Sequence, residues 1–155
     1  MGQPAPDRLL RRLDVLVGEW EITVDLPVQI YRRAWTTFEW LEGRFLVQHA
    51  DGELADGASP EWVADSPLPT TTIIGLDDAS GEFCQFFADA RGMFRIYRMS
   101  FDGGVWRLWR DAPGFHQRFT GTVVPGGAAI EATWERSADG IEWERDFDMV
   151  YTKVA

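Results

Sequence analysis

Most of the chain alternates between hydrophobic and polar residues, with a period of two. Between Trp20 and Leu26, every second residue is apolar and the residues between them are polar or acidic. This alternation is typical of a β-strand with one face in water. Comparable patterns predict nine further strands, over residues 31–40, 44–49, 70–76, 82–88, 93–101, 105–111, 117–124, 128–136 and 141–154.

One segment has a helical pattern instead, and it precedes the first strand. Leucines recur at helical spacing over residues 7–17, and Gly18 follows as a helix terminator. A helix of about ten residues is too short to be stable alone in water. We therefore expect this N-terminal helix to pack against the strands.

Short turn signals separate the predicted strands. Asp102-Gly103-Gly104, Gly126-Gly127 and Asp139-Gly140 are typical of tight hairpin turns, because glycine readily adopts positive φ. Links this short make consecutive strands antiparallel neighbours, and parallel βαβ units are excluded because no crossover helix is predicted. A twisted sheet of about ten strands tends to close. The sequence thus predicts an all-β fold, an up-and-down antiparallel barrel of about ten strands with one short N-terminal helix.

Residues 50–69 interrupt the strand pattern. This stretch is rich in Ala, Asp, Ser and Pro and contains Trp62. Loops of such length are usually functional or disordered, so the segment is interpreted as either a mobile surface loop or a lid over the barrel mouth. Nothing else suggests a second unit, and 155 residues fit a single domain over residues 1–155.

Charge and cysteine content narrow the classes of partner. The chain has 15 Lys and Arg against 25 Asp and Glu, a formal net charge of −10. Such a charge repels phosphate backbones and anionic bilayers, so neither nucleic acid nor a membrane surface is expected as a partner. Cys84 is the single cysteine, and no apolar run of about 18 residues occurs. These features predict a cytoplasmic protein.

The start of the chain resembles the calycin barrels, which include lipocalins, fatty-acid-binding proteins and nitrobindins. It has a short helix followed by a Gly-x-Trp strand, in Leu13-x-x-Leu16-Val17-Gly18-Glu19-Trp20. Two further segments resemble a nitrobindin-related, largely uncharacterised branch of these barrels. They are Tyr97-x-Met99-Ser100-x-Asp102-Gly103-x-x-Trp106-x-Leu108 and the ending Tyr151-Thr152-Lys153. The resemblance implies that the helix plugs one end of the barrel. It also implies that Trp20 lies under the barrel floor, with a late cation, here Lys153, packed on it.

The haem site of nitrobindins has no counterpart in this sequence. Nitrobindins hold haem iron through a histidine near the last strand, whereas this chain has only His49 and His116 and none after them. Two scattered histidines and one cysteine also lack the three or four closely placed ligands of a metal site. Neither haem nor a metal ion is therefore expected.

The last predicted strand provides the main candidate for a binding site. By alternation, Trp143, Arg145 and Phe147 face inward while the acidic residues between them face water. A buried Arg145 must either pair with an interior acid or receive a polar or anionic ligand group. With residues from neighbouring strands, the predicted ligand-binding set is Arg145, Trp134, Trp143, Phe119, Tyr97, Phe147 and Gln117.

Alternation does not choose an inner face in two of the predicted strands. Residues 82–88 carry phenylalanines on both faces. In residues 93–101, each face carries two apolar residues and one arginine. Tyr97 and Met99 share a face with Arg95, and Phe94 and Ile96 share the other with Arg98. Their inner faces therefore stay open at the sequence level.

Together these features predict a non-enzymatic, lipocalin-like protein that holds a small apolar or amphipathic molecule inside the barrel. Three alternatives remain: a barrel-cavity enzyme of the cyclase or isomerase type, a haem or nitric-oxide protein of nitrobindin type, and a barrel filled by its own side chains that serves as an interaction surface. No catalytic residue is assigned. The chain has eight Trp, ten Phe and three Tyr, and an exterior rich in aromatic residues would suit a homodimer.

Overall fold

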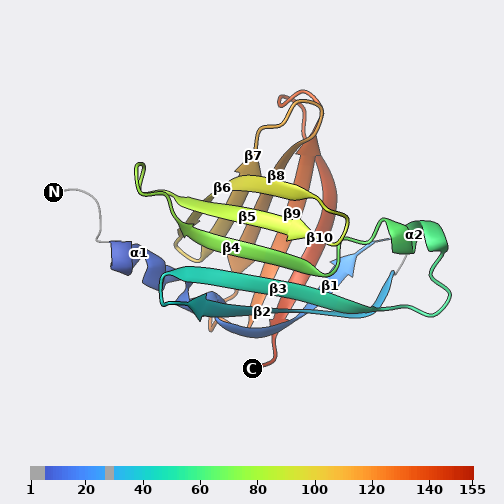
Figure 1. Ribbon diagram of the computed structural model, residues 1–155, viewed down its shortest axis with the longest axis horizontal. Coiled ribbons are helices and arrows are strands. Elements are labelled where there is room, and N and C mark those ends of the chain that lie inside the picture. The colour runs from blue at the N-terminus through green and yellow to red at the C-terminus, as the bar shows by residue number, and fades with distance from the viewer. Residues whose placement is uncertain (1–5, 27–29) are drawn as a thin grey trace.

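A computed structural model describes residues 6–26 and 30–155, and it confirms the predicted all-β barrel. Ten antiparallel strands each pair with the next along the chain, and β1 pairs with β10 to close the barrel (Figure 1). The strands are β1 (Gly18–Asp25), β2 (Tyr31–Leu41), β3 (Phe45–Leu54), β4 (Thr70–Leu76), β5 (Phe83–Asp89), β6 (Phe94–Asp102), β7 (Val105–Arg110), β8 (His116–Val123), β9 (Ala129–Ser137) and β10 (Glu144–Lys153).

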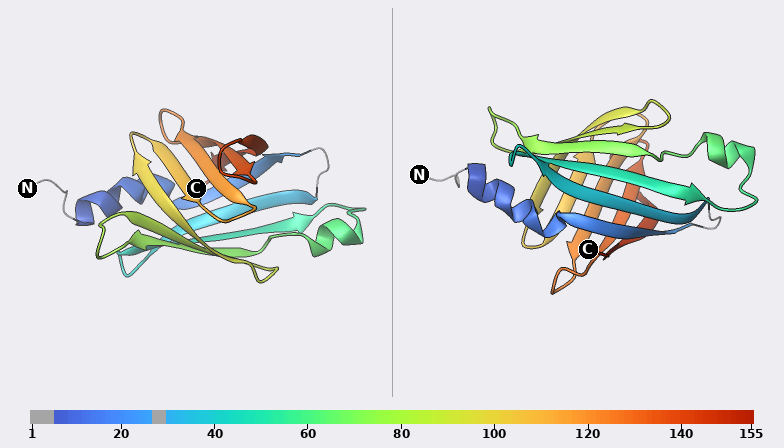
Figure 2. Two further views of the ribbon diagram at one scale, coloured as in Figure 1. Left: turned by 90° about the horizontal axis from the view of Figure 1, so that it is seen from above. Right: turned by 60° about the horizontal axis from the view of Figure 1, so that its bottom comes forward.

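The N-terminal helix has two parts, α1 (Pro6–Arg11) and the 3₁₀ turn η1 (Arg12–Leu16). Leu10, Leu13 and Leu16 are buried and belong to the same apolar cluster as the barrel interior. The helix therefore covers the end of the barrel at which β1 begins. We call the opposite end, at which β1 ends and β2 begins, the open end. Figure 2 shows the helix at one end of the strands.

Gly18 joins the helix to the barrel in a conformation that favours glycine. Its φ is +131°, and a Cβ at this position would lie 2.4 Å from the Ala155 carbonyl oxygen. That same oxygen accepts a hydrogen bond from the Glu19 amide at 2.9 Å, and the Glu19 carbonyl accepts one from the Val154 amide at 2.8 Å. The end of the chain is thus held closely against the start of β1.

Trp20 lies at the floor of the barrel, fully buried. Its indole N–H donates to the Leu16 carbonyl at 2.8 Å, which links the floor to η1. Lys153 pairs with Trp20 in register, and its Nζ lies 5.3 Å from the centroid of the indole ring. The positions predicted for Trp20 and Lys153 are therefore confirmed.

The lower half of the interior, above this floor, is filled by large side chains. The Trp106 ring packs against Phe119 at 4.8 Å, Phe38 at 6.0 Å and Tyr151 at 6.1 Å between ring centroids. All four side chains are buried. Aromatic packing of this kind adds to the apolar burial that stabilises the barrel.

Three segments differ from the sequence-based expectation. β3 continues to Leu54, so the predicted loop over residues 50–69 begins later, and it contains a short helix, α2 (Pro60–Ala64). Ser59 caps α2 through its side chain, and Trp62 on this helix is exposed; its role as a lid stays a prediction. β10 begins at Glu144 rather than at residue 141.

Within the described ranges, none of the helices has the length and apolar character that crossing a bilayer requires.

Candidate functional site

A β-bulge in β10 reverses the predicted orientation of Arg145. The pairing register with β9 shifts between Arg145 and Phe147, so that Asp146 is an extra residue. Alternation is therefore interrupted at this point. The Arg145 side chain is 68% exposed and donates to Asp148 at 2.9 Å. The predicted interior position of Arg145 is wrong, and its guanidinium forms an ion pair at the barrel surface.

Trp143 also lies outside the barrel, contrary to expectation. The Asp139 carboxylate accepts hydrogen bonds from the amides of Ile141 and Glu142 at 2.8 and 2.9 Å, which holds this segment in a turn. Trp143 follows the turn and precedes β10. The Arg118 guanidinium carbon lies 4.1 Å from the Trp143 ring centroid, and Arg118 is on the outward face of β8. The predicted interior position of Trp143 is therefore wrong.

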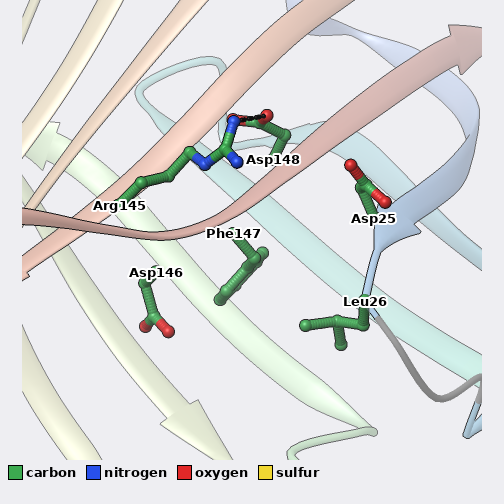
Figure 3. A pocket seen from close by; sticks show the side chains of 6 residues that line it. All are labelled: Asp25, Leu26, Arg145, Asp146, Phe147 and Asp148. Carbon is green, nitrogen blue, oxygen red and sulfur yellow. Dashed lines mark hydrogen bonds and ion pairs between the residues drawn. The ribbon is translucent and has the colours of Figure 1, made fainter.

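The bulge contributes to a shallow pocket at the open end, shown in Figure 3. The pocket has a volume of about 370 Å³, and its lining residues are Asp25, Leu26, Arg145, Asp146, Phe147 and Asp148. In Figure 3, Arg145 reaches toward Asp148 and away from Asp146. Three carboxylates against one arginine make this pocket unfavourable for an anion. Residues 6–26 and 30–155 contain no cluster of three or more His, Cys, Asp or Glu side chains suited to a metal ion.

The other five predicted residues do face the interior. Tyr97, Gln117 and Phe119 are buried, whereas Trp134 and Phe147 are half-buried. The Trp134 ring packs against Phe119 at 5.0 Å and against Tyr97 at 5.7 Å between centroids, and Phe147 pairs with Trp134 in register. Tyr97 is on β6 and Trp134 on β9, so this contact reaches across the interior.

A polar group lies beside this aromatic contact. The Tyr97 hydroxyl donates to the Gln117 amide oxygen at 2.9 Å, and the Arg95 guanidinium donates to the same oxygen at 3.3 Å. Arg110 pairs with Gln117 in register from β7. Burial raises the pKa of Tyr97, and the nearby positive charges of Arg95 and Arg110 only partly offset it. At neutral pH the Tyr97 hydroxyl is therefore protonated and acts as a donor.

Arg95 and Arg110 are half-buried cations that sequence reasoning did not select. Among the described residues, neither forms an ion pair with a carboxylate within 4.0 Å. Arg110 shares the inner face of β7 with Trp106 and Leu108, and this spacing was visible in the sequence. Arg95 shares a face with Tyr97 in the sequence pattern, but alternation does not identify the inner face of that strand.

Gln85 adds an unsatisfied acceptor to the interior. It is buried beside Tyr97 in register, and its amide oxygen has no hydrogen-bond partner among the described residues. Gln48, another buried amide, donates to the Thr36 hydroxyl at 3.1 Å. Buried polar atoms are normally hydrogen-bonded, so the Gln85 oxygen provides a position for a donor from a bound molecule or water.

The two histidines lie on the outer faces of their strands. His49 is exposed on β3 and lies 3.3 Å from the Thr71 hydroxyl. His116 lies 3.8 Å from Asp111, beyond hydrogen-bond distance. Each histidine alternates with an inward-facing glutamine, Gln48 or Gln117, and so lies on the outer side of its strand.

The fold and this arrangement define a closed antiparallel barrel with a polar group near its open end. No family model matches the chain, and no curated protein matches it. Among solved structures, the crystal structure of Rv2717c from M. tuberculosis is similar, with a TM-score of 0.56 and 16% sequence identity. The match covers 99% of this chain and 100% of that chain. At this identity the likeness concerns the barrel fold alone.

Proposed function

We propose that the protein is a calycin-like binding protein that takes a small amphipathic molecule at the open end of its barrel. The ligand's anionic group, of carboxylate type, contacts Arg95 and Arg110. The observation that carries this proposal is the pair of half-buried arginines without carboxylate partners beside the Tyr97–Gln117 hydrogen bond.

The electrostatics of this group favour an anion. Partly buried cations are costly unless a negative charge accompanies them. A guanidinium can donate two parallel hydrogen bonds to a carboxylate, which makes Arg95 and Arg110 suitable anchors. The Gln85 oxygen is an acceptor, so it suits a hydroxyl or amide on the same ligand.

The apolar body of the ligand has a matching wall. Phe87 pairs with Arg95 in register, and Phe147 pairs with Trp134. Phe87, Trp134 and Phe147 are half-buried, which leaves part of each ring free for contact. Tyr97 and Trp134 contact one another further into the barrel, so we expect the site to suit a short ligand rather than a long chain. Sites of this kind are mostly apolar with a few placed polar groups.

The test compares a medium-chain alkanoate with the alkanol of the same chain length, by isothermal titration calorimetry and tryptophan fluorescence. We expect the alkanoate to bind about 10- to 100-fold more tightly, because hydrogen bonds to charged groups are worth about 1.5–3 kcal/mol. The double variant Arg95→Met, Arg110→Met should lose this preference. Arg107→Met is the matched control, since Arg107 is exposed on the outer face of the same strand as Arg110.

Three results would contradict the proposal. The first is equal affinity for alkanoate and alkanol in the unmodified protein, which would exclude an anion site. The second is the absence of heat and of fluorescence change with both probes, since Trp134 lies in the proposed wall. A preference that survives the double variant but falls in Arg107→Met would place the anion on the outer surface instead, and would also contradict it.

A further inference from the structure

The outer face of the barrel carries a continuous apolar surface over β3, β4, β5 and β6. Val47, Ile73, Phe86 and Ile96 follow one another in direct register across these four strands. Phe94 packs beside Phe86 at 6.2 Å between ring centroids. With Phe45 on β3, these side chains form what we call the outer apolar surface: Phe45, Val47, Ile73, Phe86, Phe94 and Ile96.

These side chains are exposed to an unusual degree for their size. Phe86 is 46% exposed, Ile96 52% and Phe94 63%. Large apolar side chains scattered singly over a surface need no explanation, but a contiguous group of them commonly marks an interaction site. The four strands lie side by side on one wall of the barrel in Figure 1.

The outer apolar surface contains no ionisable side chain, although the chain has a net charge of −10. The nearest charged residues lie at its margins. Glu39 on β2 pairs with Val47, and Arg98 on β6 pairs with Cys84 and forms an ion pair with Glu82 at 3.1 Å. Two copies of an acidic protein repel one another least where such an uncharged surface separates their charges.

The area of this surface fits what a homodimer needs. Aromatic side chains present about 150–250 Å² each, so at the observed exposures the six residues expose roughly 500 Å² of apolar area. A standard interface buries about 800 Å² per partner, and homodimer interfaces are about 65% apolar. The apolar share of one such face is therefore about 500 Å² as well.

We infer that two copies of this chain associate through the outer apolar surface as a symmetric dimer. In a two-fold interface the same patch meets itself, and each contact occurs twice. A two-fold axis running along β5 at Phe86 places Ile73 of one copy against Ile96 of the other, because these residues flank Phe86 in register. This inference does not rest on the proposed ligand site, which lies on the inner face.

Light scattering with size-exclusion chromatography and sedimentation equilibrium test the association without any ligand. We expect a species of twice the 17.6 kDa chain mass at micromolar concentration. Phe86→Glu should weaken association about 100-fold or more, because the symmetry opposes two carboxylates in an apolar interface. Val150→Glu is the matched control: it adds the same charge to an exposed apolar position on the outer face of β10, and it should leave association unchanged. Circular dichroism checks that both variants stay folded.

Cys84 provides a second measurement in the unmodified chain. It lies on the outer face of β5, two residues from Phe86, and is the single cysteine of the chain. A flexible bismaleimide should therefore join two chains through Cys84 in the unmodified protein and in Val150→Glu, and should fail to do so in Phe86→Glu.

Three outcomes would overturn the inference. They are a monomer at all concentrations in both mass measurements, a dimer that Phe86→Glu leaves intact, and a monomer that binds neutral phosphatidylcholine vesicles through the same surface. The last outcome would assign the surface to a bilayer rather than to a second copy.

Discussion

Gly18 carries two separate restrictions, and replacing it with alanine tests both. The first is conformational: its φ of +131° lies where residues with a side chain are strained by about 1–3 kcal/mol. The second is spatial, because the new Cβ would lie 2.4 Å from the Ala155 oxygen. Relieving this contact displaces the end of the chain and breaks the Glu19–Ala155 hydrogen bond, worth about 0.5–1.5 kcal/mol.

Together these terms predict that Gly18→Ala lowers the free energy of unfolding by about 3 kcal/mol. For a domain of this size, the midpoint of thermal unfolding should fall by about 6–12 °C. Urea titration followed by tryptophan fluorescence measures the first quantity, and calorimetry measures the second. Gly57→Ala is the control for strain alone, since Gly57 has a φ of +78° with no heavy atom within 4 Å of a Cβ. It should cost about 1 kcal/mol.

A double-mutant cycle isolates the contact with the end of the chain. Removing residues 154 and 155 deletes the oxygen that the new Cβ would meet. In the shortened chain, Gly18→Ala should then cost less than in the full chain by about the energy of the lost hydrogen bond. The reasoning is refuted if Gly18→Ala costs no more than Gly57→Ala, or if its cost is unchanged when those two residues are removed.

Two further predictions concern the stability of the barrel. Trp20→Phe should lower the free energy of unfolding by about 2–3 kcal/mol in urea, because the Leu16 carbonyl would lose its buried donor; an unchanged midpoint would contradict the floor role of Trp20. Hydrogen bonds from Arg118 hold the pKa of Glu135 below its usual value of 4.5, so the ion pair stabilises the fold above that pH and the effect is lost as pH falls through the lowered pKa. The stability difference between the unmodified protein and Glu135→Gln should be complete at pH 7 and shrink below about pH 4.5; a difference that stays constant from pH 7 to pH 3 would contradict this assignment.

The sequence predicted the barrel because most of its strands have one apolar and one polar face. That contrast also placed Trp134, Phe119 and Gln117 on the inner face correctly. It failed for Arg145 because alternation assumes an uninterrupted strand, whereas the bulge adds one residue. A bulge depends on pairing with the neighbouring strand, so the pattern of residues 141–154 alone could not predict it.

The two strands with undecided faces failed for a different reason. β5 and β6 are apolar on both sides, since their outer side chains include Phe86, Phe94 and Ile96. Alternation cannot choose a face when neither face is wet. The undecided inner faces were therefore themselves a sign of the outer apolar surface. For the same reason, the sequence did not predict Arg95 as a residue of the candidate site. The homodimer that the sequence suggested now has a specific surface to test.

The closure of the barrel has a consequence for how the chain folds. β1 and β10 pair with Trp20 opposite Lys153, so the contact that removes the last open edges joins residues separated by nearly the whole chain. Pairings of such large sequence separation form slowly, because the entropy of a long loop is lost before the contact is gained. During synthesis, β1 and β9 keep unpaired edges until β10 has left the ribosome. Until that pairing forms, the two unpaired edges leave the nascent chain exposed to aggregation.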